Sequence, residues 1–507
     1  MPYQTTRTAI VALLLATSLS ACTLSPDPLT HGQLDLITNS NLSRVTANQE
    51  AVHGAITLHT AMARAVKYNL DHKVELMQTQ LRTTELRLAH YGMLPGTVVN
   101  SGFARRNNDL SSGERNILTG AETAPRTTSR ERNSNTSDIT FSWNILDFGL
   151  SYIRARQSAD KVLIASEARR KVMLRIIEDT RSAYWRAVSS DRMVTKLKVL
   201  EGRTRTAQSN AQKLSRSEDA SPITSLTYER ELIEIRRTAQ QLQHELSVAK
   251  TQLAALMNLA PGTDFALSGE GLDAKAPVIE VDAQDMTAAA LLNRPELRDI
   301  AYQQRINQHE AHAALLELLP GIQLYAGASY DANKYLAHNQ WVSWGTKASW
   351  NVLRVFQYPA KRDVVKGQDN LLDARALALT MAVMTQVHVS RIRYLNMSHE
   401  LVTARDYLDV QSRLVKQMRQ EAAADRISEQ TLIREELNTL VAEAKRDIAF
   451  ANMQNAFANV FASVGLDPYD KEQPTDISVK ELAEQLKSLS FERGDFGANR
   501  KISLALR

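Results

Sequence analysis

Residues 139–149 read ITFSWNILDFG, and residues 346–356 read TKASWNVLRVF. In each stretch, alternating apolar and polar residues lead through Ser-Trp-Asn into a helical pattern. Aligning Trp143 with Trp350 gives an offset of 207 residues. The two stretches therefore indicate an internal duplication of roughly 200 residues, which is too long for a solenoid repeat and predicts two similar half-molecules.

Other anchors support the duplication. Leu259 in MNLAPG and Leu466 in SVGLDP are also 207 residues apart, whereas Pro95 and Pro320, each in Leu-Pro-Gly, are 225 apart. The first copy therefore carries 18 extra residues, the difference between these offsets, before its Ser-Trp-Asn. They fall in the polar loop 107–137, which we expect to be a mobile, solvated loop.

Each copy predicts one pair of strands. Apolar residues occupy every second position, as in Ile139, Phe141 and Trp143, and each segment is about 10 residues long. That length and alternation are typical of a tilted transmembrane strand with lipid on one side and water on the other. The expected strands are 97–106, 138–146, 321–331 and 341–352, and the side chains expected to face lipid are Phe141, Trp143, Trp344 and Trp350.

A long helical hairpin follows each pair of strands. No proline interrupts residues 149–216, and after a break a second helix places apolar residues from Leu232 to Leu256 at alternating spacings of 3 and 4. That spacing is the a/d seam of a coiled coil, so we expect the two helices to pack together. The hairpins are predicted at 149–258 and 360–464.

The single cysteine lies at the end of a targeting segment. Arg7 precedes an apolar run at residues 9–16, and TSLSAC at residues 17–22 places small residues before Cys22. This pattern is typical of a secretory signal peptide. Leu-Ser-Ala-Cys also resembles the bacterial lipobox, which implies cleavage before Cys22 and a covalent lipid on its sulfur.

These signals divide the chain into six parts. They are a signal peptide at 1–21, a lipidated linker at 22–54, the first repeat at 55–261, a linker at 262–284, the second repeat at 285–466 and a polar tail at 467–507.

Composition excludes several classes of function. Lys and Arg total 61 against 56 Asp and Glu, and a net charge of +5 spread along the chain does not indicate a nucleic-acid partner. The sequence contains no phosphate-binding loop, no zinc-protease motif and no motif that would place a serine or cysteine as a catalytic nucleophile. We therefore expect that the protein is not an enzyme and binds no cofactor. His309 and His312 have a spacing compatible with metal ligation but lack a third ligand, so no metal site is expected.

Four strands per chain create a problem of closure. Four strands do not close a barrel, and an open sheet edge is not tolerated in lipid. Three copies would supply twelve strands, within the range known for outer-membrane barrels. The sequence therefore predicts a barrel built from several chains.

The duplicated order of helix, strand pair and long hairpin, the two Leu-Pro-Gly turns, SWNILDFG and NRPEL at 293–297 together resemble the TolC family of outer-membrane efflux proteins. The resemblance covers about residues 55–467. It implies an α+β, mainly α membrane protein: a homotrimer whose twelve-stranded β-barrel continues into a periplasmic α-helical barrel. The implied function is the passive exit duct of a tripartite efflux or type I secretion system. Its implied partners are a periplasmic adaptor and an inner-membrane pump of RND or ABC type, and its place is the outer membrane of a Gram-negative bacterium, lipid-anchored and extending into the periplasm.

Family members gate the periplasmic end at the hairpin turns, where the adaptor also docks. The matching residues here are Arg216, Asp219, Asp425, Arg426 and Glu429, although the glycine common at this turn is absent. Arg426 is the leading candidate for an ionic latch, and gate and docking roles are both open for all five.

A different class of protein also contains long helical hairpins. A non-channel periplasmic lipoprotein, such as an adaptor or scaffold, would carry one hairpin flanked by small β-domains. Here two hairpins each follow a strand pair with lipid-compatible alternation, which favours the duct.

Overall fold

The structure is a computed structural model that describes residues 26–113, 115–122, 127–214, 222–269, 271, 275–279, 281–424, 426–466 and 477–494. The chain divides into two compact units, residues 1–51 and 52–507. Cys22 and the signal segment lie outside the described residues.

The first unit contains one described helix, α2 (His31–Val45). Thr30 caps its N-terminus in a capping box, in which the Thr30 and Gln33 side chains each accept a hydrogen bond from the other residue's backbone N–H. All of its residues lie at the surface of this unit or are partly covered, so the helix depends on local hydrogen bonds rather than on a core.

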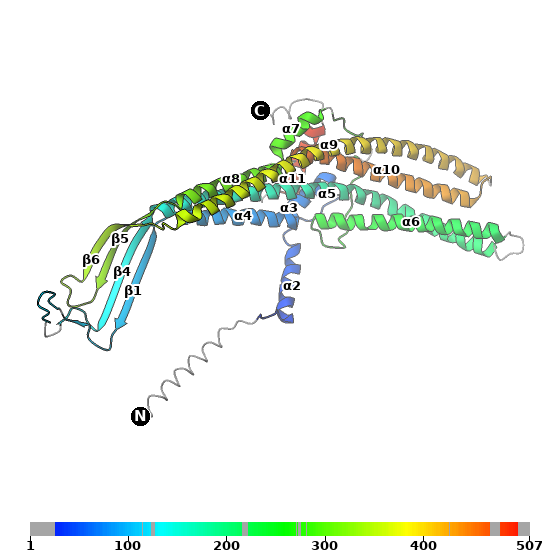
Figure 1. Ribbon diagram of the computed structural model, residues 1–507. Helices are drawn as coiled ribbons and strands as arrows, with labels where there is room; N and C mark the ends of the chain where they lie inside the picture. The colour runs from blue at the N-terminus through cyan, green and yellow to red at the C-terminus, as the bar shows by residue number, and fades with distance from the viewer. Residues whose placement is uncertain are drawn as a thin grey trace. The chain divides into compact units, whose positions relative to one another are not determined.

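The second unit contains both repeats, and each repeats the same order of elements (Figure 1). Two helices precede two main strands, and a hairpin of two long helices follows. The first repeat comprises α3 (Leu58–Tyr68), α4 (Leu70–Tyr91), β1 (Gly96–Arg105), β4 (Asn133–Asn144), α5 (Ile145–Leu214) and α6 (Pro222–Leu256). The second comprises α7 (Ala283–Asn293), α8 (Pro295–Leu316), β5 (Gly321–Asp331), β6 (Gln340–Ser349), α9 (Arg354–Ala423) and α10 (Glu429–Val464). Outside the shared plan lie β2 (Ser111–Ser112), β3 (Thr127–Thr128) and α11 (Val479–Gly494).

The long helices carry the core. Helices α5 and α9 have 70 residues each, or about 105 Å at 1.5 Å per residue. The a/d seam expected on α6 is buried at Leu232, Ile235 and Leu253, and α5 packs along this helix. The coiled-coil prediction is therefore confirmed for these positions.

The largest buried cluster joins the two repeats. The Trp185 ring of α5 meets Phe450 of α10 edge-on at 4.9 Å, and the Tyr184 hydroxyl donates to the Ile56 carbonyl at 3.1 Å. A smaller cluster packs α11 of the tail against α3. Because residues of both repeats share one core, the duplication forms one compact unit rather than two separate domains.

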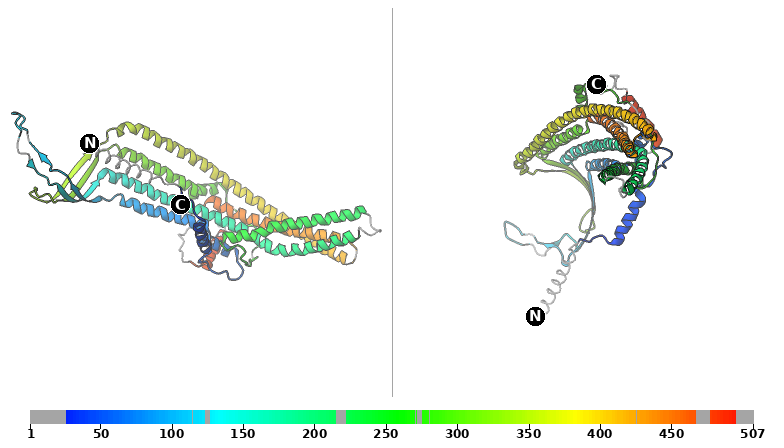
Figure 2. Two further views of the ribbon diagram at one scale, coloured as in Figure 1. Left: turned by 90° about the horizontal axis from the view of Figure 1, so that it is seen from below. Right: turned by 90° about the vertical axis from the view of Figure 1, so that its right-hand side faces the viewer.

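The four main strands form one antiparallel sheet in the order β1-β4-β5-β6. Each repeat contributes a hairpin, and β4 and β5 join the two hairpins. Within residues 52–507 the sheet lies at one end of the long helices, and the end of α5, the start of α6, the end of α9 and the start of α10 lie at the other (Figures 1 and 2). The duplicated, mainly α fold class is confirmed.

Several boundaries differ from those expected. Strand β4 occupies 133–144 rather than 138–146, because Asn133–Ser137 pairs with the end of β1, and the Asn144 side chain then accepts a hydrogen bond from the Leu146 backbone as α5 begins. Helix α9 begins at Arg354 rather than near 360 and includes Pro359 close to its start. Part of the loop expected at 107–137 is thus strand, namely β2, β3 and the start of β4.

Candidate functional site

The sheet has one continuous apolar face. Strand register aligns Val99, Ile139, Ala328 and Val342 across all four strands. The neighbouring row on the same face is Thr97, Phe141, Ala326 and Trp344, so the apolar positions of the two repeats fall on one surface. Trp344 is 82% exposed, which leaves this face open within the chain.

The opposite face is mainly polar. Asn100, Asp138 and Ser329 share one row there with Trp341 of β6, and the Asn100 amide donates to the Asp138 carboxylate at 3.0 Å. The next row includes Thr140 and Ser343. The exposed sheet therefore has one apolar and one mainly polar face.

The sheet ends in β1 and β6, and no other described strand pairs with their outer edges. Unpaired N–H and C=O groups of an edge strand template pairing with another strand. The arrangement therefore has two complementary edges, one from each repeat.

The four aromatic residues expected to face lipid do not all lie on the sheet. Phe141, Trp143 and Trp344 project from the apolar face, and the rings of Trp143 and Phe148 meet at 5.5 Å. Trp350 lies one residue beyond β6, and its indole N–H donates to the Leu318 carbonyl at 3.0 Å. Trp350 thus marks the junction between the sheet and the helices. Among the described helices, none combines the length and apolarity needed to cross a membrane.

Two of the five proposed gate residues are described: Arg426 in the turn between α9 and α10, and Glu429 at the start of α10. Arg426 Nη1 lies 3.3 Å from the Glu421 carboxylate, and its backbone N–H donates to the Glu421 carbonyl at 2.9 Å. Ser428 caps α10, and Glu429 begins it. Arg216, Asp219 and Asp425 lie outside the described residues.

The two hairpins approach each other near these turns. Burial, and next the Glu429 carboxylate on α10, raise the pKa of Tyr228 on α6. Arg434 of α10 also lies 4.0 Å from Glu231 of α6. The Glu429 end of the second hairpin is therefore packed against the first.

A ladder of ion pairs, which sequence reasoning missed, clamps α5 to α10. Its members are Arg192–Asp447 at 3.4 Å, Lys196–Glu443 at 2.5 Å and Arg203–Glu436. Steps of 4 and 7 residues along α5 are matched by equal steps in the reverse direction along α10. These steps place each set on one helix face, so the matched spacings indicate the ladder once α5 and α10 are known to be neighbours.

The ladder is most buried at Asp447, whose side chain is fully covered. Burial raises the pKa of the Asp447 carboxyl, although Arg446 and Arg192 oppose that change. The Arg446 guanidinium lies 3.1 Å away, so the carboxylate has two cationic neighbours.

A second ionic contact joins α5 to α8. The Arg305 Nε donates to Asp160 Oδ1 at 2.9 Å, and His309 Nε2 lies 3.8 Å from Asp160 Oδ2. Burial lowers the pKa of His309, with Asp160 acting in the opposite direction. Within the described parts of the chain, no group of three or more His, Cys, Asp or Glu side chains is arranged to hold a metal ion.

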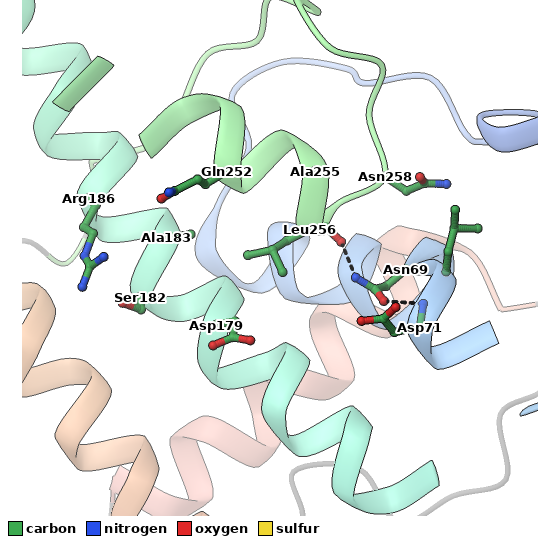
Figure 3. Close-up of a pocket in the computed structure, with 11 residues that line it drawn as sticks. Asn69, Asp71, Asp179, Ser182, Ala183, Arg186, Gln252, Ala255, Leu256 and Asn258 are labelled. Atoms are coloured by element: carbon green, nitrogen blue, oxygen red, sulfur yellow. Dashed lines mark hydrogen bonds between the residues drawn. The ribbon is translucent and has the colours of Figure 1, made fainter. Parts of the chain in front are cut away.

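A hollow of about 560 Å³ lies over α5 between the start of α4 and the end of α6 (Figure 3). Asn69 caps α4 beside it and donates to the Leu256 carbonyl at 3.3 Å. The counterpart of Asn69, 225 residues later, is Arg294, whose guanidinium donates to the Ala462 carbonyl at 2.8 Å and to Gln386 at 2.9 Å. The same place is therefore open in the first repeat and filled in the second.

Known structures share this fold. The open-state MtrE outer-membrane channel of Neisseria gonorrhoeae matches with a TM-score of 0.64 and 12% identity over 84% of this chain and 96% of its own. The CmeC outer-membrane channel of Campylobacter jejuni gives 0.63 and 11%, over 87% and 95%. The outer-membrane channel OprN gives 0.62 and 15%, over 81% and 90%. No protein-family model and no curated protein matches the sequence.

Proposed function

We propose that this chain is a subunit of an outer-membrane exit duct of the TolC family. The observation that carries the proposal is the four-stranded sheet with one apolar face, one polar face and two unpaired edges. A lipid-facing sheet requires closed edges, and three copies of four strands would close a twelve-stranded barrel. The shared fold of the outer-membrane channels supports this assignment.

In the proposed homotrimer the helices continue the barrel into the periplasm. Each chain would supply four long helices, so a tube of twelve helices would extend from the sheet to the hairpin turns. The duct itself performs no chemistry; a periplasmic adaptor and an inner-membrane pump of RND or ABC type would deliver the substrate and the energy in efflux or type I secretion.

Lipidation would add a tether to this assembly. We place the acyl chains on Cys22, the only cysteine of the sequence. One lipidated terminus supplements a barrel already held by its apolar belt. Cys22→Ser should therefore abolish labelling by a radioactive fatty acid and leave assembled trimer in the membrane; loss of all inserted protein would contradict this role.

Gating is assigned to the hairpin turns, with Arg426 as the latch toward a neighbouring hairpin; within its own turn Arg426 pairs with Glu421, five residues before it. The pair is exposed and 3.3 Å apart, so it contributes less than about 1 kcal/mol and separates easily. Ionic contacts of this strength suit a closure that a docked adaptor releases.

Conductance of the purified full-length protein in a planar lipid bilayer tests the duct. We expect discrete single-channel steps of low conductance in the closed state. Protein that reconstitutes into the bilayer without conducting steps would favour the non-channel lipoprotein instead.

A further inference from the structure

Helix α9 exposes apolar side chains whose counterparts on α5 are buried. At the 207-residue offset Tyr407 corresponds to Leu200; Tyr407 is 56% exposed and Leu200 is 3% exposed. The same contrast holds for Ile392, Leu395 and Leu414 against Trp185, Val188 and Ala207.

The offset is supported by the structure and not only by the sequence alignment. Buried positions of α9, such as Val383 and Val387, fall on buried positions of α5, Ile176 and Thr180. Helices α3 and α4 match α7 and α8 end to end at the 225-residue offset. The two repeats therefore provide internal templates for each other.

Helix α6 also exposes an apolar side chain whose counterpart in the other repeat is buried. Leu226 is 63% exposed, whereas its counterpart on α10, Ile433, is fully buried in the cluster that contains Leu200. Within the chain, α5 lies against both α8 and α10. Helix α4 is the counterpart of α8, and α6 is the counterpart of α10. By this correspondence, the exposed surface of α4 and α6 is the one that α9 needs as its partner.

We propose that α9 of one chain packs on α4 and α6 of a second copy, in the register that α5 adopts against α8 and α10. The inference rests on the proposed trimer and specifies the seam between its chains. At the 207-residue offset, Lys196 corresponds to Thr403 and Glu443 to Arg236, so we expect Thr403 to face Arg236 of the next copy.

The hollow in Figure 3 falls within this seam. In the second repeat α5 covers the equivalent place, where Arg170 donates to the Gly465 carbonyl at 2.8 Å. The offsets put Leu377 of α9, which is 73% exposed, opposite Asn258 at the rim of the hollow. Between copies, the apolar Leu377 would therefore occupy the position that the charged Arg170 occupies within the chain.

The strands extend the same register. Within the chain Phe141 of β4 faces Ala326 of β5. The offsets convert this pair to Ala348 of β6 facing Ser101 of β1 in the next copy. Both residues belong to the apolar face, so the derived register keeps that face continuous around the closed sheet.

The seam between chains would also differ in chemistry from the seam within a chain. The ladder pairs Arg192–Asp447 and Arg203–Glu436 convert to His399–Gln240 and Val410–Glu229. Each converted pair lacks the opposite charges of its template. The contact between copies would therefore depend on apolar burial, whereas the contact within each chain has an ionic ladder.

Cysteine crosslinking of purified full-length protein tests the register. A chain carrying Thr403→Cys and Arg236→Cys, treated with a short bismaleimide, should yield covalent trimers on a denaturing gel. The matched control, Lys196→Cys with Glu443→Cys, should crosslink within the chain and stay at monomer mass, with the linked peptides identified by mass spectrometry. A register-shifted pair, Thr403→Cys with Glu229→Cys, should crosslink at least tenfold less.

The outcomes separate the two proposals. Trimers in detergent that crosslink through the shifted pair, or through neither pair, would overturn the register and leave the duct standing. A monomeric protein that forms no trimer in detergent would overturn the duct and the seam together.

Discussion

Helices α5 and α9 occupy equivalent positions in the two repeats, yet their equivalent faces meet different surroundings. The α5 face is buried against α8 and α10 and carries the charges of an ionic ladder, whereas the α9 face is exposed and apolar. Both faces need a partner, but only α5 finds it within its own chain. Duplication has thus left one seam that folds with the chain and one that is open for assembly.

The difference has a physical basis. Ion pairs need accurate geometry to offset the desolvation of their charges, and folding of a single chain supplies that geometry. Apolar burial is not directional and scales with the area removed from water, so it suits association of separate chains.

The largest effect should come from a charge on the exposed face of α9. Tyr407→Asp would bury an unpaired carboxylate at each seam, a change that costs about 3 kcal/mol or more. We expect the trimer to be lost while each chain remains helical, as measured by mass in detergent and by circular dichroism.

Val199→Asp provides the matched control. Val199 of α5 is 62% exposed, and its counterpart on α9 is already an aspartate, Asp406. This variant should assemble normally. Equal loss of assembly in both variants would show that added charge, rather than the α9 face, is responsible.

A smaller effect should come from breaking the ladder. Glu436 receives both Arg203 and Arg419, and only 11% of its side chain is exposed. Glu436→Gln should lower the free energy of unfolding by about 1–2 kcal/mol, because hydrogen bonds to a charged group are lost. Thermal unfolding should show this loss at unchanged trimer stoichiometry.

Asp409→Asn is the control for that change, because the pair that Asp409 forms with Arg413 at 3.1 Å is exposed. Its melting temperature should stay close to that of the parent protein. A stoichiometry that changes with Glu436→Gln would mean that the ladder acts between chains.

A pH effect should arise at Glu178 on α5. Burial, and then Asp179, raise the pKa of Glu178 from 4.5 to about 7. The folded protein therefore holds this proton more tightly than the unfolded chain does, and the resulting stability is present below about pH 4.5 and is lost as the pH rises through about 7.

Glu178→Gln should consequently gain stability relative to the parent protein between pH 5 and pH 8, as measured by melting temperature across that range. Glu234→Gln, at an exposed site on α6, should follow the parent at every pH. Parallel curves for all three proteins would exclude a raised pKa at Glu178.

The smallest energetic effect should come from the proposed latch. Arg426→Ala removes an exposed pair and should change stability by less than about 1 kcal/mol, yet raise single-channel conductance. Arg413→Ala removes an arginine that is as exposed as Arg426 and also forms an ion pair, but away from the turn, and should leave conductance unchanged. Identical traces for both variants would remove Arg426 from the gate.

Much of the fold could be predicted from the sequence, because repeated anchors and period-two alternation are local signals. Phe141, Trp143 and Trp344 were placed on the apolar face by alternation alone, and the register confirms that they share it. The start of β4 at Asn133 was missed, since its polar residues pair by backbone hydrogen bonds and carry no hydrophobic pattern.

The ionic ladder was harder to predict. Arg203 and Glu436 are 233 residues apart, and their pairing depends on the antiparallel register of two helices from different repeats. The sequence contains the matched spacings but not the alignment that brings them together. Charges on a long helix also occur at many solvated positions, so the spacing becomes informative only once the neighbouring helix is known.

Closure of one barrel by three copies of four strands can be tested by a covalent ring. In a chain with Ser101→Cys and Ala348→Cys, oxidation should join β6 of each copy to β1 of the next, because directly opposite residues of antiparallel strands bring their Cβ atoms to about 4.5–5.5 Å. We expect a closed covalent trimer on a non-reducing denaturing gel. Monomers alone, or a ladder extending beyond the trimer, would contradict it.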